Sequence, residues 1–309
     1  MKVAVVGASG FIGARLTRYL ASVTDLTVVA VARAKPADLP FNVEFRSAPH
    51  VASAEQMRPH FSDVDAVVYA AGNAVPRTFE VERYAAFEAE TAALANVVDA
   101  LPTNRPIRFV FLSSGGTVYG ESLRAAHREQ DCQTPTGFYG ASKLACEALL
   151  FAYAARGQLV PVVLRLSNCY GPGQRANRGQ GVVAAFGAAF LAGTPIEIWG
   201  TGQAIRDFVY VDDAVEAIAL AIRYRGGERV FNIGSAAGVS VNQLLETLSA
   251  VIVAKPQVRY IGADAGAVHS NVLDIELAKS ALGWSPKTGL EEGLRNTLRW
   301  LRDQSNSLN

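Results

Sequence analysis

GASGFIG, residues 7–13, follows the apolar run Lys2–Val6 and leads directly into the helical pattern of Phe11–Ser22. A glycine turn between a strand and a helix lets backbone N–H groups approach a pyrophosphate, and the helix N-terminus adds partial positive charge. The spacing is G-x-x-G-x-x-G, and its place between a strand and a helix near the start of the chain strengthens the signal over a plain tight turn. The residues predicted to bind the dinucleotide here are Gly7, Ser9, Gly10, Phe11, Ile12 and Gly13.

Short β-rich apolar runs alternate with longer segments of helical period. This alternation predicts an α/β fold, a Rossmann-type doubly wound parallel sheet with crossover helices. The expected strands are Lys2–Val6, Leu26–Ala32, Val43–Phe45, Ala66–Ala70, Arg108–Ser113 and Val160–Leu166. The expected helices are Phe11–Ser22, Ala54–Phe61, Val81–Leu101, Tyr139–Arg156, Val182–Ala192, Val211–Ile222, Val241–Ile252 and Glu291–Arg302.

The regular alternation weakens from about Ser167, where Gly, Pro and Arg gather in NCYGPGQRANRGQG. Such a loop-rich region is expected at the carboxyl ends of the strands, where open α/β sheets bind ligands. We expect a dinucleotide-binding domain over residues 1–167, to which 208–233 returns. A smaller, discontinuous α/β substrate-binding domain is expected over 168–207 and 234–309.

Composition excludes several function classes. The 309 residues carry 29 basic and 28 acidic side chains, so no global field draws the protein to nucleic acid or to an anionic membrane. Three cysteines and four histidines lack the spacing of a disulfide framework or a metal site. No apolar stretch reaches the roughly 18 residues of a membrane span, and a cytoplasmic protein is expected.

The end of the second expected strand bears on the choice of dinucleotide. An acidic side chain there accepts hydrogen bonds from the adenosine ribose, whereas a nearby arginine suits a 2′-phosphate. Ala32 occupies the position of the acid, and Arg33 follows it with Lys35 behind. The cofactor is therefore predicted to be NAD or NADP, with Arg33 favouring NADP; the alternative is that Arg33 is a solvated surface charge.

YGASK, residues 139–143, opens a strongly helical stretch. A separation of four residues places Tyr139 and Lys143 on one helix face. A neighbouring ammonium favours the phenolate and lowers the pKa of a tyrosine, which can then exchange a proton with a sugar or alcohol hydroxyl while a nicotinamide takes or returns hydride. The pattern predicts that Tyr139 and Lys143 are catalytic and contact the cofactor.

The chain resembles the extended short-chain dehydrogenase/reductases, and within them the NAD-dependent epimerase/dehydratase family, over nearly its full length. The motifs that carry the resemblance are GASGFIG (7–13), DVDAVVYAAG (63–72), SSGGTVYG (113–120), YGASK (139–143), LRLSNCYGPGQ (164–174), RDFVYVDD (206–213), FNIGS (231–235) and LDIELAKSALGWSP (273–286). The resemblance also implies that Ala70, Ala71 and Gly72 lie at the cofactor.

In this family a Ser or Thr before V-Y-G hydrogen-bonds the reacting hydroxyl. Gly115 occupies that position here, flanked by Ser114 and Thr117. We expect Thr117, and after it Ser114, to take the role, because a bound sugar needs one donor within about 3 Å and the pair Gly115 and Gly116 lets the substrate come closer. The alternative is that both hydroxyls only satisfy backbone groups at the strand end.

The resemblance implies a substrate site as well. Asn168 matches an asparagine that contacts a nucleotide diphosphate, and Arg206 an arginine that binds its phosphates. Where the family usually has a second arginine, this chain has Asp264, so Arg175 or Arg178 is expected to replace it, or the substrate is not the usual diphosphate sugar. Trp199 is expected either to stack on a sugar or to belong to the core.

Two further departures lie on the cofactor side. Glu90 stands where the family usually carries a structural asparagine in its long helix. Arg46 is expected after the third strand, where an aspartate often meets the adenine.

The resemblance implies a nucleotide-sugar epimerase, acting at C4 through a transient 4-keto sugar. The first alternative is an NADPH-dependent reductase of a 4-keto nucleotide sugar or another small ketone, which Arg33 favours. The second is a non-catalytic dinucleotide-binding sensor, against which the intact pair of Tyr139 and Lys143 argues. The expected partners are a nucleotide sugar and a second copy of the chain, docked through the helices around 81–101 and 139–156.

Overall fold

The computed structural model describes residues 1–49, 52–72, 76–121, 125–176, 181–262 and 268–306. Contacts between residues divide the chain into two compact units that alternate along the sequence. The first unit comprises Met1–Ser114, Gly137–Arg165 and Val215–Phe231. The second comprises Gly115–Thr136, Leu166–Ala214 and Asn232–Asn309. The domain boundaries expected from the sequence stay a prediction.

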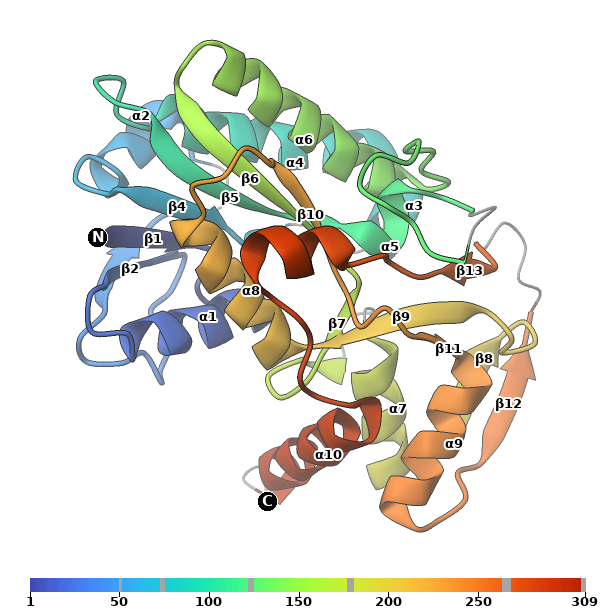
Figure 1. Cartoon of the computed structure of the whole chain (residues 1–309). Coiled ribbons are helices and arrows are strands. Elements are labelled where there is room, and N and C mark those ends of the chain that lie inside the picture. The colour runs from blue at the N-terminus through green and yellow to red at the C-terminus, as the bar shows by residue number, and fades with distance from the viewer. Residues whose placement is uncertain (50–51, 73–75, 122–124, 177–180, 263–267, 307–309) are drawn as a thin grey trace. The chain divides into compact units, whose positions relative to one another are not determined.

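A seven-stranded parallel sheet organises the first unit (Figure 1). Its order is β10-β6-β5-β4-β1-β2-β3. The strands are β1 (Lys2–Val6), β2 (Thr27–Ala32), β3 (Glu44–Ser47), β4 (Ala66–Tyr69), β5 (Ile107–Ser114), β6 (Leu159–Leu166) and β10 (Val230–Ile233). The chain runs outward from β1 in both directions, so the strand order reverses between β1 and β4, where open α/β sheets bind ligands. The Rossmann-type sheet predicted from the sequence is confirmed.

Helices cover both faces of this sheet. They are α1 (Phe11–Ala21), α2 (Ala54–Met57), α3 (Pro76–Val81), α4 (Arg83–Asp99), α6 (Phe138–Ala155) and α8 (Val211–Arg223). In Figure 1, α4 and α6 run along one face and α1 along the other. Under α4 and α6, Leu94, Val97 and Leu150 are almost completely buried against the strands. Each such side chain stabilises the fold by about 1.5–3 kcal/mol relative to an exposed one.

Two of the expected helices differ from the observed ones. The helix expected over Val81–Leu101 corresponds to α4, which begins two residues later at Arg83; the separate helix α3 precedes it, and Glu82 between the two is non-helical. The segment Ala54–Phe61 forms α2 and then a short 3₁₀ helix, η1 (Arg58–His60). Pro59 explains this second change, because proline has no N–H with which to continue an α-helical ladder.

The second unit is built on smaller sheets. The strands β7 (Asn168–Tyr170), β9 (Ile205–Tyr210), β11 (Gly238–Ser240) and β13 (Ser270–Asn271) form one, and β8 (Ile196–Trp199) pairs with β12 (Val258–Ile261). Its other elements are α5 (Gly115–Val118), α7 (Val182–Leu191), α9 (Val241–Ile252), the π-helical turn η3 (Ala278–Leu282) and α10 (Leu290–Asn306). Ser240 caps α9 by accepting a hydrogen bond from Gln243 N, and the Gln243 side chain accepts one from Ser240 N in return.

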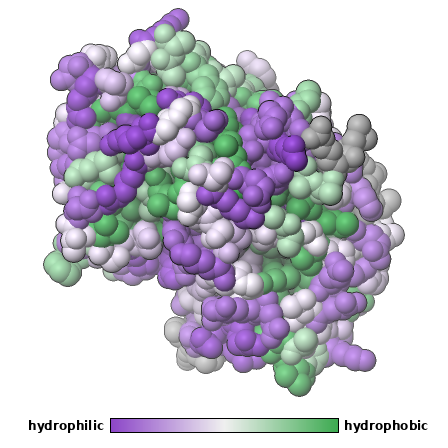
Figure 2. All heavy atoms as spheres, in the orientation of Figure 1, coloured by the Kyte–Doolittle hydropathy of each residue, from purple (hydrophilic) through white to green (hydrophobic). Residues whose placement is uncertain are grey.

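Among the described residues, no helix combines the length and the apolar character needed to cross a membrane. On the face seen in Figure 2, hydrophilic and hydrophobic residues are interspersed.

Candidate active site

In the glycine turn after β1, backbone atoms of the turn lie close to one another and to the backbone of Ala70 and Ala71. Gly7 has a φ of +88°, a conformation that favours glycine. A Cβ added at Gly7 would lie 2.7 Å from the Ala71 nitrogen, and one at Gly13 would lie 2.2 Å from the Gly7 oxygen. The turn therefore has no room for side chains at these positions. It also brings together residues 7–13, Ala70 and Ala71, which the sequence predicts at the cofactor.

The N-terminus of α1 suits an anion. Its N-cap is Gly10, which provides no side-chain cap, so the first-turn N–H groups are not covered by one. Gly7 N and Ala8 N donate to Val31 O at 3.0 and 3.3 Å and so fasten the turn to β2. Ser9 is exposed beside it. An uncapped helix start behind a closely packed glycine turn fits the pyrophosphate of a dinucleotide.

The residue that directly follows β2, Arg33, has its guanidinium in solvent. Ala32 is buried and closes the strand, and Arg33 is exposed. The Arg33 carbonyl accepts a hydrogen bond from Ser47 Oγ, whereas its guanidinium makes no ion pair with any residue that the structure describes. No acidic side chain directly follows Ala32 at the end of β2. Gly72, which comes shortly after β4, is also exposed.

Tyr139 and Lys143 lie one turn apart on α6, as the sequence predicts. The Lys143 ammonium is 5.6 Å from the centroid of the Tyr139 ring. Phe79 of α3 packs edge-on against the same ring, with centroids 5.7 Å apart at 71°. Within the described part of the chain the Tyr139 hydroxyl has no hydrogen-bond partner.

The charge environment of Tyr139 differs from the expectation. Burial raises the pKa of Tyr139, the Lys143 ammonium lowers it, and the Glu90 carboxylate raises it again; the net pKa is above its ordinary value. The lowering by Lys143 that the sequence predicts is present, but burial outweighs it.

Glu90 is a partner of Lys143 that sequence reasoning did not assign. Lys143 Nζ donates to Glu90 Oε1 at 2.6 Å, and both side chains are almost fully buried. The ammonium also lies 5.3 Å from the centroid of Phe111. Burial lowers the pKa of Lys143, but Glu90 and then Tyr139 raise it well above its ordinary value. The only signal in the sequence was an acidic residue where the family usually has an amide.

A second buried pair lies one turn further along α6. Arg165 Nη2 donates to Glu147 Oε2 at 2.7 Å, and Ser113 Oγ donates to Glu147 Oε1 at 2.5 Å. All three side chains are buried. The Ser113 hydroxyl is therefore engaged in the scaffold.

Ser114 ends β5, and Gly115, Gly116 and Thr117 form most of α5. The buried Gly115 carbonyl accepts a hydrogen bond from Asn271 Nδ2 at 3.2 Å. Ser114, Gly116 and Thr117 are half-buried. Their roles toward a substrate stay predictions.

Asn168 and Arg206 lie on adjacent strands of the second unit, β7 and β9. Asn168 Nδ2 donates to Asp207 O at 2.9 Å, and Arg206 Nη1 donates to Ile205 O at 2.7 Å. Asp207, which sequence reasoning passed over, is completely buried between them and accepts hydrogen bonds from Ser235 N and Oγ at 2.7 and 2.8 Å. Burial raises the pKa of Asp207 overall, although the bonds from Ser235 lower it.

The remaining substrate predictions fall on the surface or outside the described residues. Trp199 is 69% exposed, so the alternative that it belongs to the core is wrong. Arg175 is exposed. Arg178 and Asp264 lie outside the described residues.

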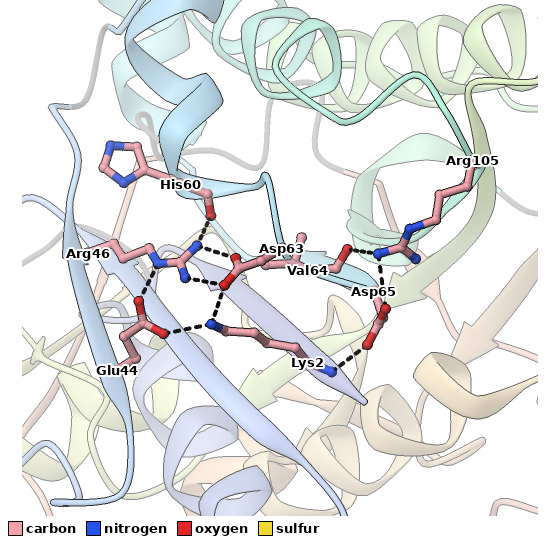
Figure 3. A network of polar contacts seen from close by, with 8 residues as sticks. All are labelled: Lys2, Glu44, Arg46, His60, Asp63, Val64, Asp65 and Arg105. Atoms are coloured by element: carbon pink, nitrogen blue, oxygen red, sulfur yellow. Dashed lines mark hydrogen bonds and ion pairs between the residues drawn. The ribbon is translucent and has the colours of Figure 1, made fainter.

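Arg46 belongs to a charge network of the first unit (Figure 3). It lies within β3 rather than after it, because β3 ends at Ser47. Its guanidinium donates to Glu44, to Asp63 and to the carbonyl of His60. The expectation of a position after the strand is therefore wrong, and the side chain is held by acidic partners.

The chain is similar to known proteins. The model of the NAD dependent epimerase/dehydratase family matches residues 3–234. The chain is 34% identical to a dTDP-4-dehydro-6-deoxyglucose reductase of Escherichia coli, over 63% of this chain and 61% of that protein. It is 33% identical to a UDP-glucose 4-epimerase of Mycolicibacterium smegmatis, over 70% of this chain and 66% of that protein. Both matches thus span less than two thirds of the relative's length.

A solved structure is similar over the whole chain. The UDP-glucose 4-epimerase of Thermotoga maritima, solved with UDP-glucose, has a TM-score of 0.90 at 31% identity, covering 99% of this chain and 100% of that one. With the family model matching most of the sequence, the chain belongs to the NAD-dependent epimerase/dehydratase family.

Proposed function

We propose that this chain is an NAD(P)-dependent epimerase that inverts C4 of a nucleotide-linked hexose through a transient 4-keto sugar. The observation that carries the proposal is Tyr139 one turn before Lys143 on α6, in the same unit as a glycine turn that fits a pyrophosphate. The similarity to UDP-glucose 4-epimerases supports the substrate class.

Each residue has a definite part in this proposal. When bound, the dinucleotide supplies a nicotinamide that accepts hydride from the sugar carbon and returns it to the other face. Tyr139 takes the hydroxyl proton in the first half-reaction and returns it in the second, and Lys143 stabilises the phenolate between them. Thr117, with Ser114 second, hydrogen-bonds the reacting hydroxyl. Asn168 and Arg206 bind the nucleotide diphosphate, with Arg175 and an exposed Trp199 at its periphery.

The test is turnover without added cofactor. Purified protein incubated with UDP-glucose is expected to form UDP-galactose, followed by proton NMR of the sugar, and mass spectrometry of the denatured protein is expected to release a nicotinamide dinucleotide. A protein that binds the dinucleotide but converts no UDP-glucose under these conditions would not be an epimerase of this substrate.

A second candidate is an NADPH-dependent reductase of a 4-keto nucleotide sugar. Arg33 favours it, because an exposed guanidinium with no acid at Ala32 suits the 2′-phosphate of NADP. The raised pKa of Tyr139, caused chiefly by burial, favours a phenol that donates a proton. NADPH consumed in equal amount to a 4-keto sugar nucleotide supports reduction, whereas catalytic interconversion without net NADPH loss supports epimerisation.

We also infer a homodimer through α4 and α6. These two helices pack against each other and leave apolar side chains in solvent: Tyr84 is 81% exposed and Phe138 43%. Sedimentation at micromolar concentration is expected to give twice the chain mass, and Tyr84→Asp is expected to shift the protein toward the monomer.

A further inference from the structure

Lys143 is held by a carboxylate from another helix. Glu90 on α4 and Lys143 on α6 lie 53 residues apart in sequence, and their charged atoms meet at 2.6 Å with side chains 2% and 5% exposed. An ammonium fixed in this way has few accessible orientations. The positive charge is therefore held at one position, 5.6 Å from the centroid of the Tyr139 ring.

The surroundings add no compensating charge in the part of the chain that the structure describes. The titratable groups that act on Tyr139 are Lys143, Glu90 and Cys146, and Tyr69 of β4 faces the same ion pair. Burial raises the pKa of the Cys146 thiol to about 12 and that of Tyr69 above its ordinary value, so both are neutral at physiological pH. The phenol therefore faces one positive and one negative charge, which oppose each other in their effect on its proton.

We propose that Glu90 is a positioning residue for the reaction: it fixes the Lys143 ammonium beside Tyr139 and offsets part of its charge, so that both groups, and not Lys143 alone, set the proton affinity of the phenol. This inference rests on the proposed chemistry of Tyr139. It deepens that proposal, because a phenol that takes a proton in one half-reaction and returns it in the other depends on the charges beside it.

An ion pair that only stabilises the fold would have the same geometry as Glu90 and Lys143. It would differ in one respect, because its loss would not change the pKa of Tyr139. Glu147 and Arg165 form such a pair on the same helix. If Glu90 only stabilised the packing of α4 on α6, its removal would lower stability without changing the proton affinity of Tyr139.

The experiment is a pH titration of tyrosines labelled with carbon-13 at Cζ, in the full-length protein without substrate. Tyr139→Phe identifies the signal of Tyr139. In the wild type this signal is expected to titrate above the ordinary pKa of about 10. In Glu90→Gln its midpoint is expected to fall by at least about one pH unit, because the unopposed ammonium favours the phenolate. Glu88→Gln removes the same charge from an exposed site on α4 and is expected to leave the midpoint unchanged.

Two results would overturn the inference: a wild-type midpoint below the ordinary value, or an unchanged midpoint in folded Glu90→Gln. The first needs no variant at Glu90 and decides the matter even if Glu90→Gln does not fold. Glu90→Asp keeps the charge and is expected to stay close to the wild type. The readout is independent of turnover, so a protein with the expected titration but no activity on nucleotide sugars would contradict the proposed function and leave this inference standing.

Discussion

Helix α6 carries two buried ion pairs one turn apart, and they differ in the chemistry of the cation. Lys143 meets Glu90 beside Tyr139, the residue proposed to transfer the proton, whereas Glu147 meets Arg165 beside Ser113. All four charged side chains are at most 5% exposed. Burial alone therefore does not distinguish an ion pair beside the proposed active site from an ion pair that only stabilises the fold.

The cations respond differently to the loss of their partners. A buried lysine can release its proton, since desolvation lowers its pKa, but an arginine stays charged at every pH that a protein tolerates. The charge of the pair with Arg165 is thus fixed, and we call it the fixed pair. The charge of the pair with Lys143 can change with protonation, and we call it the adjustable pair. A site that moves protons is expected to use the adjustable one.

The largest effect is expected where the fixed pair is broken. Glu147→Gln leaves the Arg165 guanidinium buried without its carboxylate, and removing one partner of a buried pair costs about 3–5 kcal/mol of unfolding free energy. Because arginine cannot deprotonate, this loss should be the same at pH 6 and pH 9. Urea denaturation at both values measures it, and a loss that shrinks with pH would contradict the assignment.

Removing the Tyr139 hydroxyl, which the proposed mechanism uses, is expected to have the next largest effect, and on activity alone. Tyr139→Phe should lower kcat on the order of a hundredfold or more, the usual scale of acid–base catalysis. The ring and its contact with Phe79 remain, so the melting temperature should change little. Steady-state kinetics of a variant that turns over nearly as fast as the wild type would remove Tyr139 from the mechanism.

Breaking the adjustable pair should give a loss of stability that depends on pH. In Glu90→Gln, Tyr139 is expected to release its proton in the folded protein below its ordinary pKa of about 10. The unfolded chain then binds more protons, so stability rises with pH by up to about 1.4 kcal/mol per unit between the two pKa values. The deficit relative to the wild type should therefore shrink from pH 6 to pH 9.5, whereas a constant deficit would make this pair equivalent to that of Arg165.

The smallest effect is expected in the exposed network of Figure 3. The Arg46 guanidinium, and after it Lys2, holds the pKa of Asp63 far below its usual range. A depressed carboxyl pKa contributes stability above the unfolded-state value of about 3.9 and loses it as the pH falls further. Because Asp63 is 48% exposed, Asp63→Asn should cost at most about 1 kcal/mol at pH 7, and this cost should shrink as the pH falls below about 3.9 toward the lowered pKa of Asp63.

The sequence predicts the sheet and the glycine turn well because their signals are local. The turn after β1 needs glycine at positions where a Cβ would clash with backbone atoms. The glycines in the sequence therefore directly predict the close packing of this turn. Likewise, a spacing of four residues is sufficient to place Tyr139 near Lys143. The separate helix α3 before Glu82 was not predicted, whereas α4 was expected close to its observed bounds.

The opposing charges of Lys143 and Glu90 beside Tyr139 could not be predicted from the sequence. Glu90 acts on Lys143 only because α4 packs on α6, and nothing near either residue in the chain records that contact. The same holds for Asp207, whose partner Ser235 is 28 residues away. Roles of Ser114, Thr117, Asn168 and Arg206 toward a substrate stay predictions.

The close packing of the glycine turn also bears on how a dinucleotide is bound. Gly7 and Gly13 are in contact through backbone atoms, and bonds to Val31 hold the turn on the neighbouring strand. The conformational freedom of this segment is thus lost when the chain folds and not when the ligand arrives. A preorganised cradle of this kind lowers the entropic cost of association, so tight retention of the ligand requires few additional contacts.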